Sequence, residues 1–300
     1  MKCLVTGGAG FIGSNLVDKL IATGNEVVII DDLSTGKESN INPKATFYQL
    51  DISTMSDYSP FKDVDVVFHT AALARVQPSI EDPITYDKVN VGGTLRVLKA
   101  CVDNNVKRFV FSSSSSVYGD IDEKELPTTE MTSLNPISPY ALHKLIGEQY
   151  CKLFSEIYGL ETVCLRYFNV YGNRMSLEGA YKLVIPIFTE QILNGNPMTI
   201  NGDGEQRRDF TYVDDVVQAN ISAGTIGGEF KGDVFNIGNG DNRSVNQIAD
   251  MLGGDRKHLK PVIEPKVTLA DNTKARKLLN FEPSMDIESW IPIWKKDMGL

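Results

Sequence analysis

The sequence has no long apolar run, and none of its hydrophobic stretches approaches the roughly 20 residues that a bilayer-spanning helix needs. It also has no excess of positive charge, because 39 acidic residues outnumber 30 basic ones and give a net charge of −9. This balance argues against a general binder of nucleic acid or of membrane surfaces. An anionic ligand would therefore need a local basic pocket.

Cysteine and histidine are scarce and scattered. The four cysteines show no C-x-x-C spacing and the chain has only three histidines, so we expect neither a metal site nor a disulfide framework. Isolated cysteines of this kind are usually small buried residues in a reducing compartment. No signal-peptide pattern precedes the first apolar run, which begins at Lys2. We therefore expect a cytoplasmic protein.

Short apolar runs alternate with amphipathic segments through the first half of the chain. Runs that are apolar throughout indicate a parallel sheet covered by helices on both faces. The predicted strands are Lys2–Thr6, Glu26–Ile30, Thr46–Leu50, Val64–His69, Val106–Ser112 and Thr162–Tyr167. The predicted helices are Phe11–Ala22, Ile84–Asn104 and Pro139–Tyr158, and the polar segment Asp120–Asn135 is a predicted loop over the carboxyl edge of the sheet.

The regular alternation ends near Gly172. Beyond it, the predicted helices are Ala180–Asn194, Val213–Gly224, Ser244–Leu252 and Asp271–Leu279, separated by short strands and turns. We expect an α/β protein with a Rossmann-type doubly wound parallel sheet and a smaller carboxyl-terminal α/β lobe. The expected division is residues 1–171 and residues 172–300, with the chain crossing back into the first domain around 209–240.

A glycine-rich segment joins the first predicted strand to the first helix. Gly7, Gly10 and Gly13 have the spacing G-x-x-G-x-x-G, with Phe11 and Ile12 between the last two. Glycines let the backbone approach a pyrophosphate, and the free N–H groups at a helix start favour an anion. A glycine triplet alone is weak evidence, but a strand before it and a helix after it are the context of a dinucleotide site. A purely structural turn is the alternative.

Acidic residues follow the second and third predicted strands. Asp31 lies where a carboxylate accepts hydrogen bonds from a ribose 2′-hydroxyl, and its charge would repel a 2′-phosphate, so NAD is favoured over NADP. Asp32 is able to share or assume that role, and a turn or capping acid is the alternative. Asp51 and Ile52 are placed to meet the adenine, although this placement is not specific.

Two further patterns suit proton transfer. Tyr140 and Lys144 lie four residues apart, on one face of the predicted helix, and an ammonium near a phenol lowers its pKa. A tyrosine tuned in this way takes a proton from a sugar hydroxyl while a nicotinamide takes the hydride. The serine run 112–116 follows the fifth strand, where open α/β sheets bind ligands. On composition alone a polar turn is favoured there, and a proton-relaying hydroxyl is the alternative.

Taken together, these motifs resemble the extended short-chain dehydrogenase/reductase family, and most closely its UDP-hexose 4-epimerases. The resemblance rests on the glycine turn, the serine run that ends in Val-Tyr-Gly, Tyr140-x-x-x-Lys144 and Leu165-Arg166-Tyr167-Phe168-Asn169. It covers nearly the whole chain, in the family's order and spacing. It implies a catalytic triad of Ser114, Tyr140 and Lys144.

The resemblance also implies two sets of binding residues. The NAD contacts would be Gly7, Gly10, Phe11, Ile12, Gly13, Asp31, Asp32, Ser34, Thr35, Gly36, Asp51, Ile52, Ala71, Asn90, Tyr140, Lys144, Tyr167 and Val170. The UDP-sugar contacts would be Ser114, Asn169, Leu183, Val184, Asn201, Arg208 and Thr268. The side-chain chemistry independently supports Arg208 as a contact, because Arg207-Arg208 supplies local positive charge for a diphosphate.

Residues 115 and 116 distinguish among the reactions of the family. Dehydratases resembling this chain carry an Asp-Glu pair there, and decarboxylases usually carry a glutamate, whereas this chain has Ser115-Ser116. Without those carboxyl groups a 4-keto sugar recovers its hydride, so the expected reaction is NAD-dependent C4 epimerisation of a UDP-hexose. A dehydratase or decarboxylase of the same family is the alternative, and a non-catalytic NAD-binding regulator is a more remote one.

Thr268 occupies the position that resembles the family's gate beside the sugar C2 substituent. A small residue there admits an N-acetyl group, so UDP-N-acetylglucosamine is an expected substrate alongside UDP-glucose. The chain departs from the family at residues 261–265, where relatives carry an arginine; a diphosphate contact is lost there or passed to Lys266.

The family usually forms homodimers by pairing helices that correspond to 84–104 and 139–158. The apolar positions of those helices are equally consistent with packing on the sheet.

Overall fold

Seven parallel strands form the central sheet of the molecule, in the order β11-β6-β5-β4-β1-β2-β3. The computed structural model describes residues 1–175, 183–262 and 264–300. The strands of the sheet are β1 (Lys2–Thr6), β2 (Glu26–Asp31), β3 (Thr46–Gln49), β4 (Val66–His69), β5 (Arg108–Ser114), β6 (Glu161–Tyr167) and β11 (Lys231–Ile237). The predicted Rossmann-type fold is confirmed, and its apolar strands are explained by burial on both faces.

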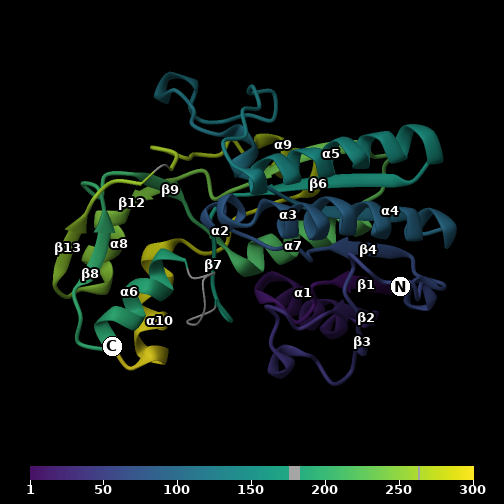
Figure 1. Cartoon of the computed structure of the whole chain (residues 1–300), viewed down its shortest axis with the longest axis horizontal. Helices are drawn as coiled ribbons and strands as arrows, with labels where there is room; N and C mark the ends of the chain where they lie inside the picture. Colours follow the sequence, from purple (N-terminus) through teal and green to yellow (C-terminus); the bar gives the residue numbers. More distant parts are fainter. Residues whose placement is uncertain (176–182, 263) are drawn as a thin grey trace.

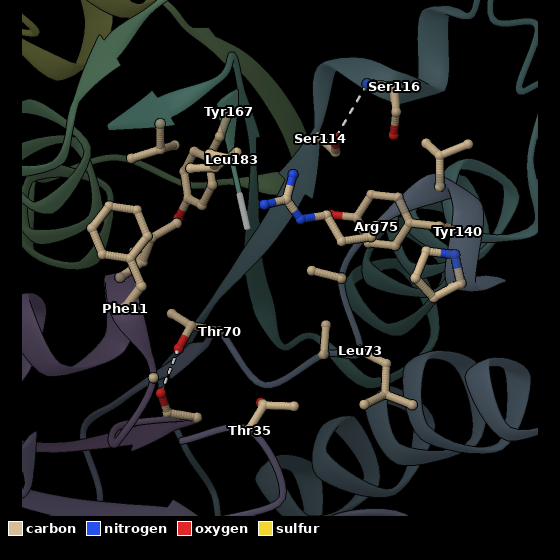
Figure 2. A pocket seen from close by; sticks show the side chains of 18 of the residues that line it. Phe11, Thr35, Thr70, Leu73, Arg75, Ser114, Ser116, Tyr140, Tyr167 and Leu183 are labelled. Atoms are coloured by element: carbon tan, nitrogen blue, oxygen red, sulfur yellow. Dashed lines mark hydrogen bonds between the residues drawn. The ribbon is translucent and has the colours of Figure 1, made fainter. Parts of the chain in front are cut away.

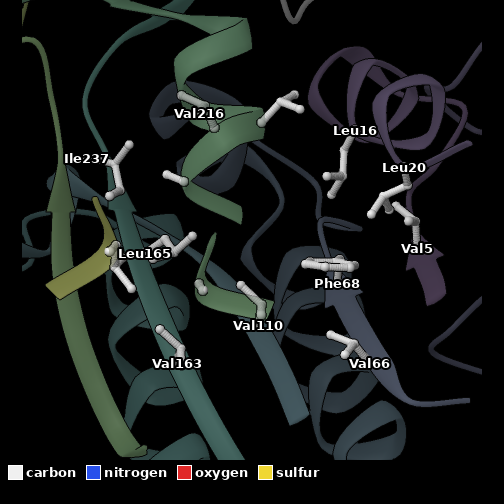
Figure 3. Packing of buried hydrophobic residues seen from close by; sticks show 14 of the residues in the cluster. Val5, Leu16, Leu20, Val66, Phe68, Val110, Val163, Leu165, Val216 and Ile237 are labelled. Carbon is white, nitrogen blue, oxygen red and sulfur yellow. The ribbon is translucent and has the colours of Figure 1, made fainter. Parts of the chain in front are cut away.

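Helices cover the two faces of this sheet. On one face α1 (Phe11–Ala22), α7 (Val213–Thr225) and α9 (Thr273–Leu279) enclose a core with the strands. Figure 3 shows Leu16 and Leu20 of α1 and Val216 of α7 directed toward Phe68 and Val110 of the sheet. On the other face, α4 (Thr94–Asp103) and α5 (Pro139–Tyr158) pack on the second core cluster.

The local sequence explains the bounds of α5, which carries Tyr140 and Lys144. The Ser138 side chain accepts a hydrogen bond from the Ala141 N–H, and Pro139 occupies the first turn, where its missing N–H costs nothing. The helix ends at Gly159, whose φ of 70° is the left-handed conformation that glycine adopts without strain. Twenty residues of the predicted helix, Pro139–Tyr158, are confirmed.

A smaller lobe lies beside the carboxyl edge of the sheet, to the left in Figure 1. Its core is built around Trp290 and Trp294, which stack with ring centroids 5.2 Å apart. Its helices are α6 (Val184–Leu193), α8 (Val245–Leu252) and α10 (Ile287–Met298). Its short strand pairs are β8 (Met198–Asn201) with β13 (Arg256–Leu259), and β9 (Arg207–Asp209) with β12 (Asn242–Ser244). A third pair, β7 (Val170–Tyr171) with β10 (Thr211–Tyr212), lies between the lobe and the sheet.

The chain returns to the large sheet between Val213 and Ile237. Helix α7 packs on the sheet and strand β11 pairs with β6 at its edge. Neither β11 nor α10 is among the elements that the sequence predicts. Strand β11 contains Gly232 and a register shift, and α10 contains Pro292, which weakens the helical pattern.

The predicted long helix over Ile84–Asn104 is present as an unbroken helical segment over 83–103, whose middle is π-helical and not α-helical. The segment contains α3 (Pro83–Asp87), a π-helical turn over Lys88–Gly93 and then α4, and a short α2 (Val76–Glu81) precedes it. The π turn brings Gly93 against Ile52, where an added Cβ would lie 2.7 Å from Cδ1. A long-range contact therefore sets this backbone, and helical periodicity does not reveal it.

Other predicted bounds differ by small amounts. Strand β5 extends through Ser114, so the first three serines of the run belong to the strand and not to a turn. The Asp120–Asn135 loop contains one short 3-10 helix, η5 (Glu123–Glu125). Residues 180–182 of the predicted helix Ala180–Asn194 lie outside the described residues, and α6 begins at Val184. Within the described ranges, no helix has both the length and the apolar character to cross a membrane.

Candidate active site

A cavity of about 1090 Å³ runs along the carboxyl edge of the sheet and continues to the small lobe. The ends of β1, β2, β4, β5 and β6 line one side of it, and residues around α6, β8 and β9 line the other. This is the edge at which open α/β sheets bind ligands. Most residues that the sequence identifies as candidate contacts meet here, although they come from segments as distant in the chain as Gly7 and Thr268.

The glycine turn forms one end of the cavity. Gly7 has a φ of 72°, and its N–H donates to the Ile30 carbonyl at 2.7 Å. A Cβ on Gly13 would lie 2.2 Å from the Gly7 carbonyl oxygen and 2.7 Å from Thr70 Oγ1. Gly10 is the N-cap of α1, and it has no side chain to cover the N–H groups of the first helical turn. Gly10, Phe11 and Ile12 all line the cavity. This cradle fits a pyrophosphate.

Asp31 and Asp32 have different roles in the structure. Asp31 is buried at the end of β2 and accepts hydrogen bonds from the Ala9 and Leu33 N–H groups at 3.0 and 2.8 Å. Burial raises its pKa, which these backbone donors oppose. Asp32 is exposed and accepts from the N–H and hydroxyl of Ser34 instead. Both carboxylates line the cavity, where a ribose hydroxyl could donate to either of them.

The remaining cofactor candidates fall into two groups. Those that line the cavity are Ser34, Thr35, Asp51, Ile52, Ala71, Tyr140, Tyr167 and Val170. Gly36, Asn90 and Lys144 are not among the described lining residues. Gly36 packs under Asp31, where a Cβ would lie 2.8 Å from Oδ1. Asn90 uses its amide on the Leu73 backbone, accepting from its N–H at 2.8 Å and donating to its carbonyl at 2.9 Å.

Ser114 and Tyr140 converge at the centre of the cavity, in the view of Figure 2. Ser114 ends β5 and its Oγ accepts a hydrogen bond from the Ser116 N–H at 3.1 Å. The Tyr140 N–H is held by Ser79 Oγ at 3.1 Å. Burial raises the pKa of Tyr140, while its hydrogen bond with Ser114 and the charge of Arg75 act in the opposite direction. The predicted lowering by Lys144 is wrong for the protein alone, because desolvation of the phenol outweighs the nearby positive charge.

Lys144 lies behind the Tyr140 ring. Its Nζ donates to the Ser112 carbonyl at 2.7 Å and lies 5.8 Å from the centroid of the Tyr140 ring. Burial lowers its pKa to about 8, so the ammonium form is populated at neutral pH and lost above that value. The same side chain therefore holds β5 in place and supplies positive charge beside Tyr140.

The far end of the cavity contains the predicted UDP-sugar contacts. Leu183, Val184, Asn169, Asn201, Arg208 and Thr268 all line it. Thr268 Oγ1 accepts from the Asp209 N–H at 3.1 Å and from the Asn169 amide at 3.2 Å. Arg208 forms an ion pair with Glu264, which also accepts from Gln206. An entering diphosphate would replace this carboxylate as the partner of Arg208.

Comparison with known proteins identifies the family. A model of the NAD dependent epimerase/dehydratase family matches residues 3–238. The chain belongs to this family. A UDP-glucose 4-epimerase of Mycolicibacterium smegmatis is 36% identical over 97% of this chain and 96% of its own length.

Two solved structures are also similar to this member of the family. The UDP-N-acetylglucosamine 4-epimerase of Methanobrevibacter ruminantium M1, in complex with UDP-N-acetylmuramic acid, is 38% identical with a TM-score of 0.90 over 99% of this chain and 98% of that one. The UDP-glucose 4-epimerase of Thermotoga maritima, with UDP-glucose, is 38% identical with a TM-score of 0.91 over 99% and 100% of the two chains.

The sequence analysis misses several groups that shape this epimerase/dehydratase site. Arg75 lines the cavity next to Tyr140, and Glu264 forms an ion pair with Arg208. Ser79 holds the backbone N–H of Tyr140. Arg75 had one usable signal, since it lies in the loop that follows β4, at the ligand-binding edge of the sheet. The contacts of Ser79 and Glu264 span 61 and 56 sequence positions and have no local signature.

Proposed function

We propose that this protein epimerises UDP-hexoses at C4, as an isomerase that keeps NAD tightly bound. The observation that supports this proposal most directly is the identity of residues 115 and 116, which lie beside Ser114. Ser115 and Ser116 line the cavity, and no carboxyl group stands at these two positions to remove water or assist loss of carbon dioxide. The single outcome left for a 4-keto sugar is reduction back to an alcohol.

Proton transfer is the part of the reaction that we assign to Ser114 and Tyr140. When bound, NAD accepts the hydride of the sugar C4 and later returns it, so there is no net redox change. Tyr140 takes the proton of the C4 hydroxyl, directly or through Ser114, and gives it back after the sugar has turned. The Lys144 ammonium favours the phenolate when Tyr140 ionises. The glycine turn and Asp31 would hold the cofactor, and Arg208 would hold the diphosphate while the ring turns.

An assay with two UDP-sugars tests this proposal. Incubation with UDP-N-acetylglucosamine and with UDP-glucose should give the C4 epimers without change of mass, resolved by NMR or chromatography. Because Thr268 is small, both sugars should turn over. Thr268→Tyr should exclude the N-acetyl group sterically, so kcat/KM for UDP-N-acetylglucosamine should fall by about 10-fold or more relative to kcat/KM for UDP-glucose. An unchanged ratio would remove Thr268 as the gate. A product that has lost water or carbon dioxide would identify the dehydratase or decarboxylase alternative, and no turnover would favour the regulator.

We also propose a homodimer formed by α4 and α5. Several large apolar side chains on or beside these helices are exposed in the single chain: Ile84, Leu95, Leu142, Leu153 and Ile157. Their exposure shows that they do not pack on the sheet, and exposed large apolar side chains on neighbouring helices suit an interaction site. The native chain should sediment at twice 33.1 kDa.

Substitution of the helix face tests the dimer. Leu153→Glu should give a monomer with unchanged circular dichroism, because a charge would be buried at the interface. Leu193→Glu, an equally exposed leucine of the small lobe, serves as the matched control and should remain dimeric. A wild-type chain that stays monomeric at micromolar concentration would contradict the proposal.

The domain roles and the location complete the proposal. Residues 1–171, with the returning segment 209–240, would bind NAD, and the rest of 172–300 would hold the nucleotide sugar. All four cysteines are free and buried, which suits the reducing cytoplasm.

A further inference from the structure

Arg75 has an unusual backbone at the centre of the cavity. Its φ of 96° and ψ of 140° lie outside the conformations that non-glycine residues favour. Backbone outliers of this kind persist when the surroundings over-determine them, and they cluster at ligand sites. The conformation of Arg75 is therefore imposed by its surroundings and points to a role in binding.

Two buried side chains hold the backbone that precedes Arg75. Asn90 makes a pair of hydrogen bonds to Leu73, and the Tyr86 hydroxyl donates to the Ala74 carbonyl at 2.8 Å. Asn90 and Tyr86 are each 3% exposed, so these anchors are shielded from water. The direction of Arg75 is consequently set by rigid elements, the π turn and α3, and not by a loose loop.

The side chain of Arg75 enters the reaction end of the cavity. Figure 2 shows its guanidinium extending from beside the Tyr140 ring toward Ser114 and Tyr167. A C4 hydroxyl that reaches Ser114 and Tyr140 places the substituents on the neighbouring carbons, C3 and C5, within range of this group. Burial lowers the pKa of Arg75, because desolvation disfavours its charged form.

The serine turn offers a second donor near the same place. Ser116 lines the cavity, and its Oγ is buried and makes no hydrogen bond within the described part of the chain. A buried hydroxyl without a partner is uncommon and calls for an explanation. The Arg75 guanidinium presents a fixed fork of N–H groups, which suits the two oxygens of a carboxylate, and Ser116 lines the same cavity.

We propose that Arg75 is a specificity-determining residue that binds a carboxylate on the sugar ring, carried either by C5, as in a hexuronate, or by an ether at O3. The proposal rests on the function proposed above and deepens it, since it names acidic UDP-hexoses as preferred substrates over their neutral counterparts. Thr268 is expected to select at C2 and Arg75 at C3 or C5, so the two selections are tested with different sugars.

Matched substrate pairs test this assignment. The first pair is UDP-glucuronate and UDP-glucose, which differ at C6, and the second is UDP-N-acetylmuramate and UDP-N-acetylglucosamine, which differ at O3. The wild-type protein should prefer the acidic member of one pair, and that pair locates the carboxylate. Arg75→Gln should lower kcat/KM for that acidic sugar by roughly 10- to 100-fold, mainly through KM, and change the neutral sugar less than about threefold. Arg75→Lys should retain part of the preference, and Arg276→Gln, at an exposed position of α9 that does not line the cavity, should retain all of it.

Other outcomes are equally decisive. Equal losses of kcat for the acidic and neutral sugars would overturn the proposal and make Arg75 a group that acts on Tyr140. No loss for any sugar would exclude a role in recognition. If the wild-type protein turns over none of the four sugars, the proposed epimerisation fails. Calorimetric affinities for the same pairs, measured with wild-type protein and Arg75→Gln, then decide the role of Arg75 separately.

Discussion

Replacing Tyr140 with phenylalanine should lower kcat for C4 epimerisation by about 1,000-fold or more while NAD stays bound. The expectation follows from the position of the hydroxyl, which is the titratable group paired with Ser114 at the centre of the cavity. General acid–base catalysis contributes roughly 10²- to 10⁴-fold, and Ser114 alone, with the ordinary high pKa of a hydroxyl, is a poor base. The ring itself is retained in phenylalanine, so packing against the loop that carries Arg75 is preserved.

Three measurements separate loss of chemistry from loss of structure. Turnover is followed by NMR, the NAD content of purified protein by absorbance after denaturation, and the fold by circular dichroism. Tyr58→Phe is the matched control, because Tyr58 is a half-exposed tyrosine remote from the cavity. Turnover of Tyr140→Phe within tenfold of wild type would remove Tyr140 as the proton-transfer group.

Replacing Gly13 with alanine should remove most of the NAD. Gly13 has an ordinary helical conformation, so the effect is one of space and not of backbone strain. Its Cβ would lie 2.2 Å from the Gly7 oxygen and 2.8 Å from the Gly7 carbonyl carbon, which are main-chain atoms of the turn itself. Relief requires that the turn move away from α1, and the pyrophosphate cradle depends on that close approach. Overpacking of this kind costs about 1–3 kcal/mol of folding stability.

A second glycine provides the control for this substitution. Gly92 lies in the π turn, and a Cβ there would meet nothing within 4 Å. Gly92→Ala should therefore keep its NAD and its stability, whereas Gly13→Ala should retain less than about a tenth of the cofactor, as expected for loss of close backbone contacts. Cofactor content is measured by absorbance and stability by urea unfolding. A Gly13→Ala protein that purifies with a full complement of NAD would contradict the assignment of the turn.

The structure also changes how the Tyr140–Lys144 pair is understood. The spacing on one helix face is correct, but Lys144 donates to Ser112 and does not line the cavity, and the net shift of the Tyr140 pKa is upward. Local spacing predicts which side chains share a face. It does not predict desolvation, which depends on everything packed around them.

By itself, the sequence determined the features that rest on local chemistry. These are the apolar strands, the glycine turn before α1, the acid at the end of β2, the capped helix α5 and the absence of carboxyl groups at positions 115 and 116. Each follows from backbone geometry or side-chain type within a few residues.

Only the tertiary structure decided which distant groups meet. Strand β11 pairs with β6, and Asn90 forms hydrogen bonds with the Leu73 backbone. Glu264 forms an ion pair with Arg208, and Arg75 lies in the cavity beside Tyr140. The order of strands in the sheet and the packing of the small lobe set these distances, and neither is a property of local sequence. For that reason the sequence predicts the reaction, whereas the proposed preference for an acidic sugar depends on the arrangement of side chains in the folded cavity.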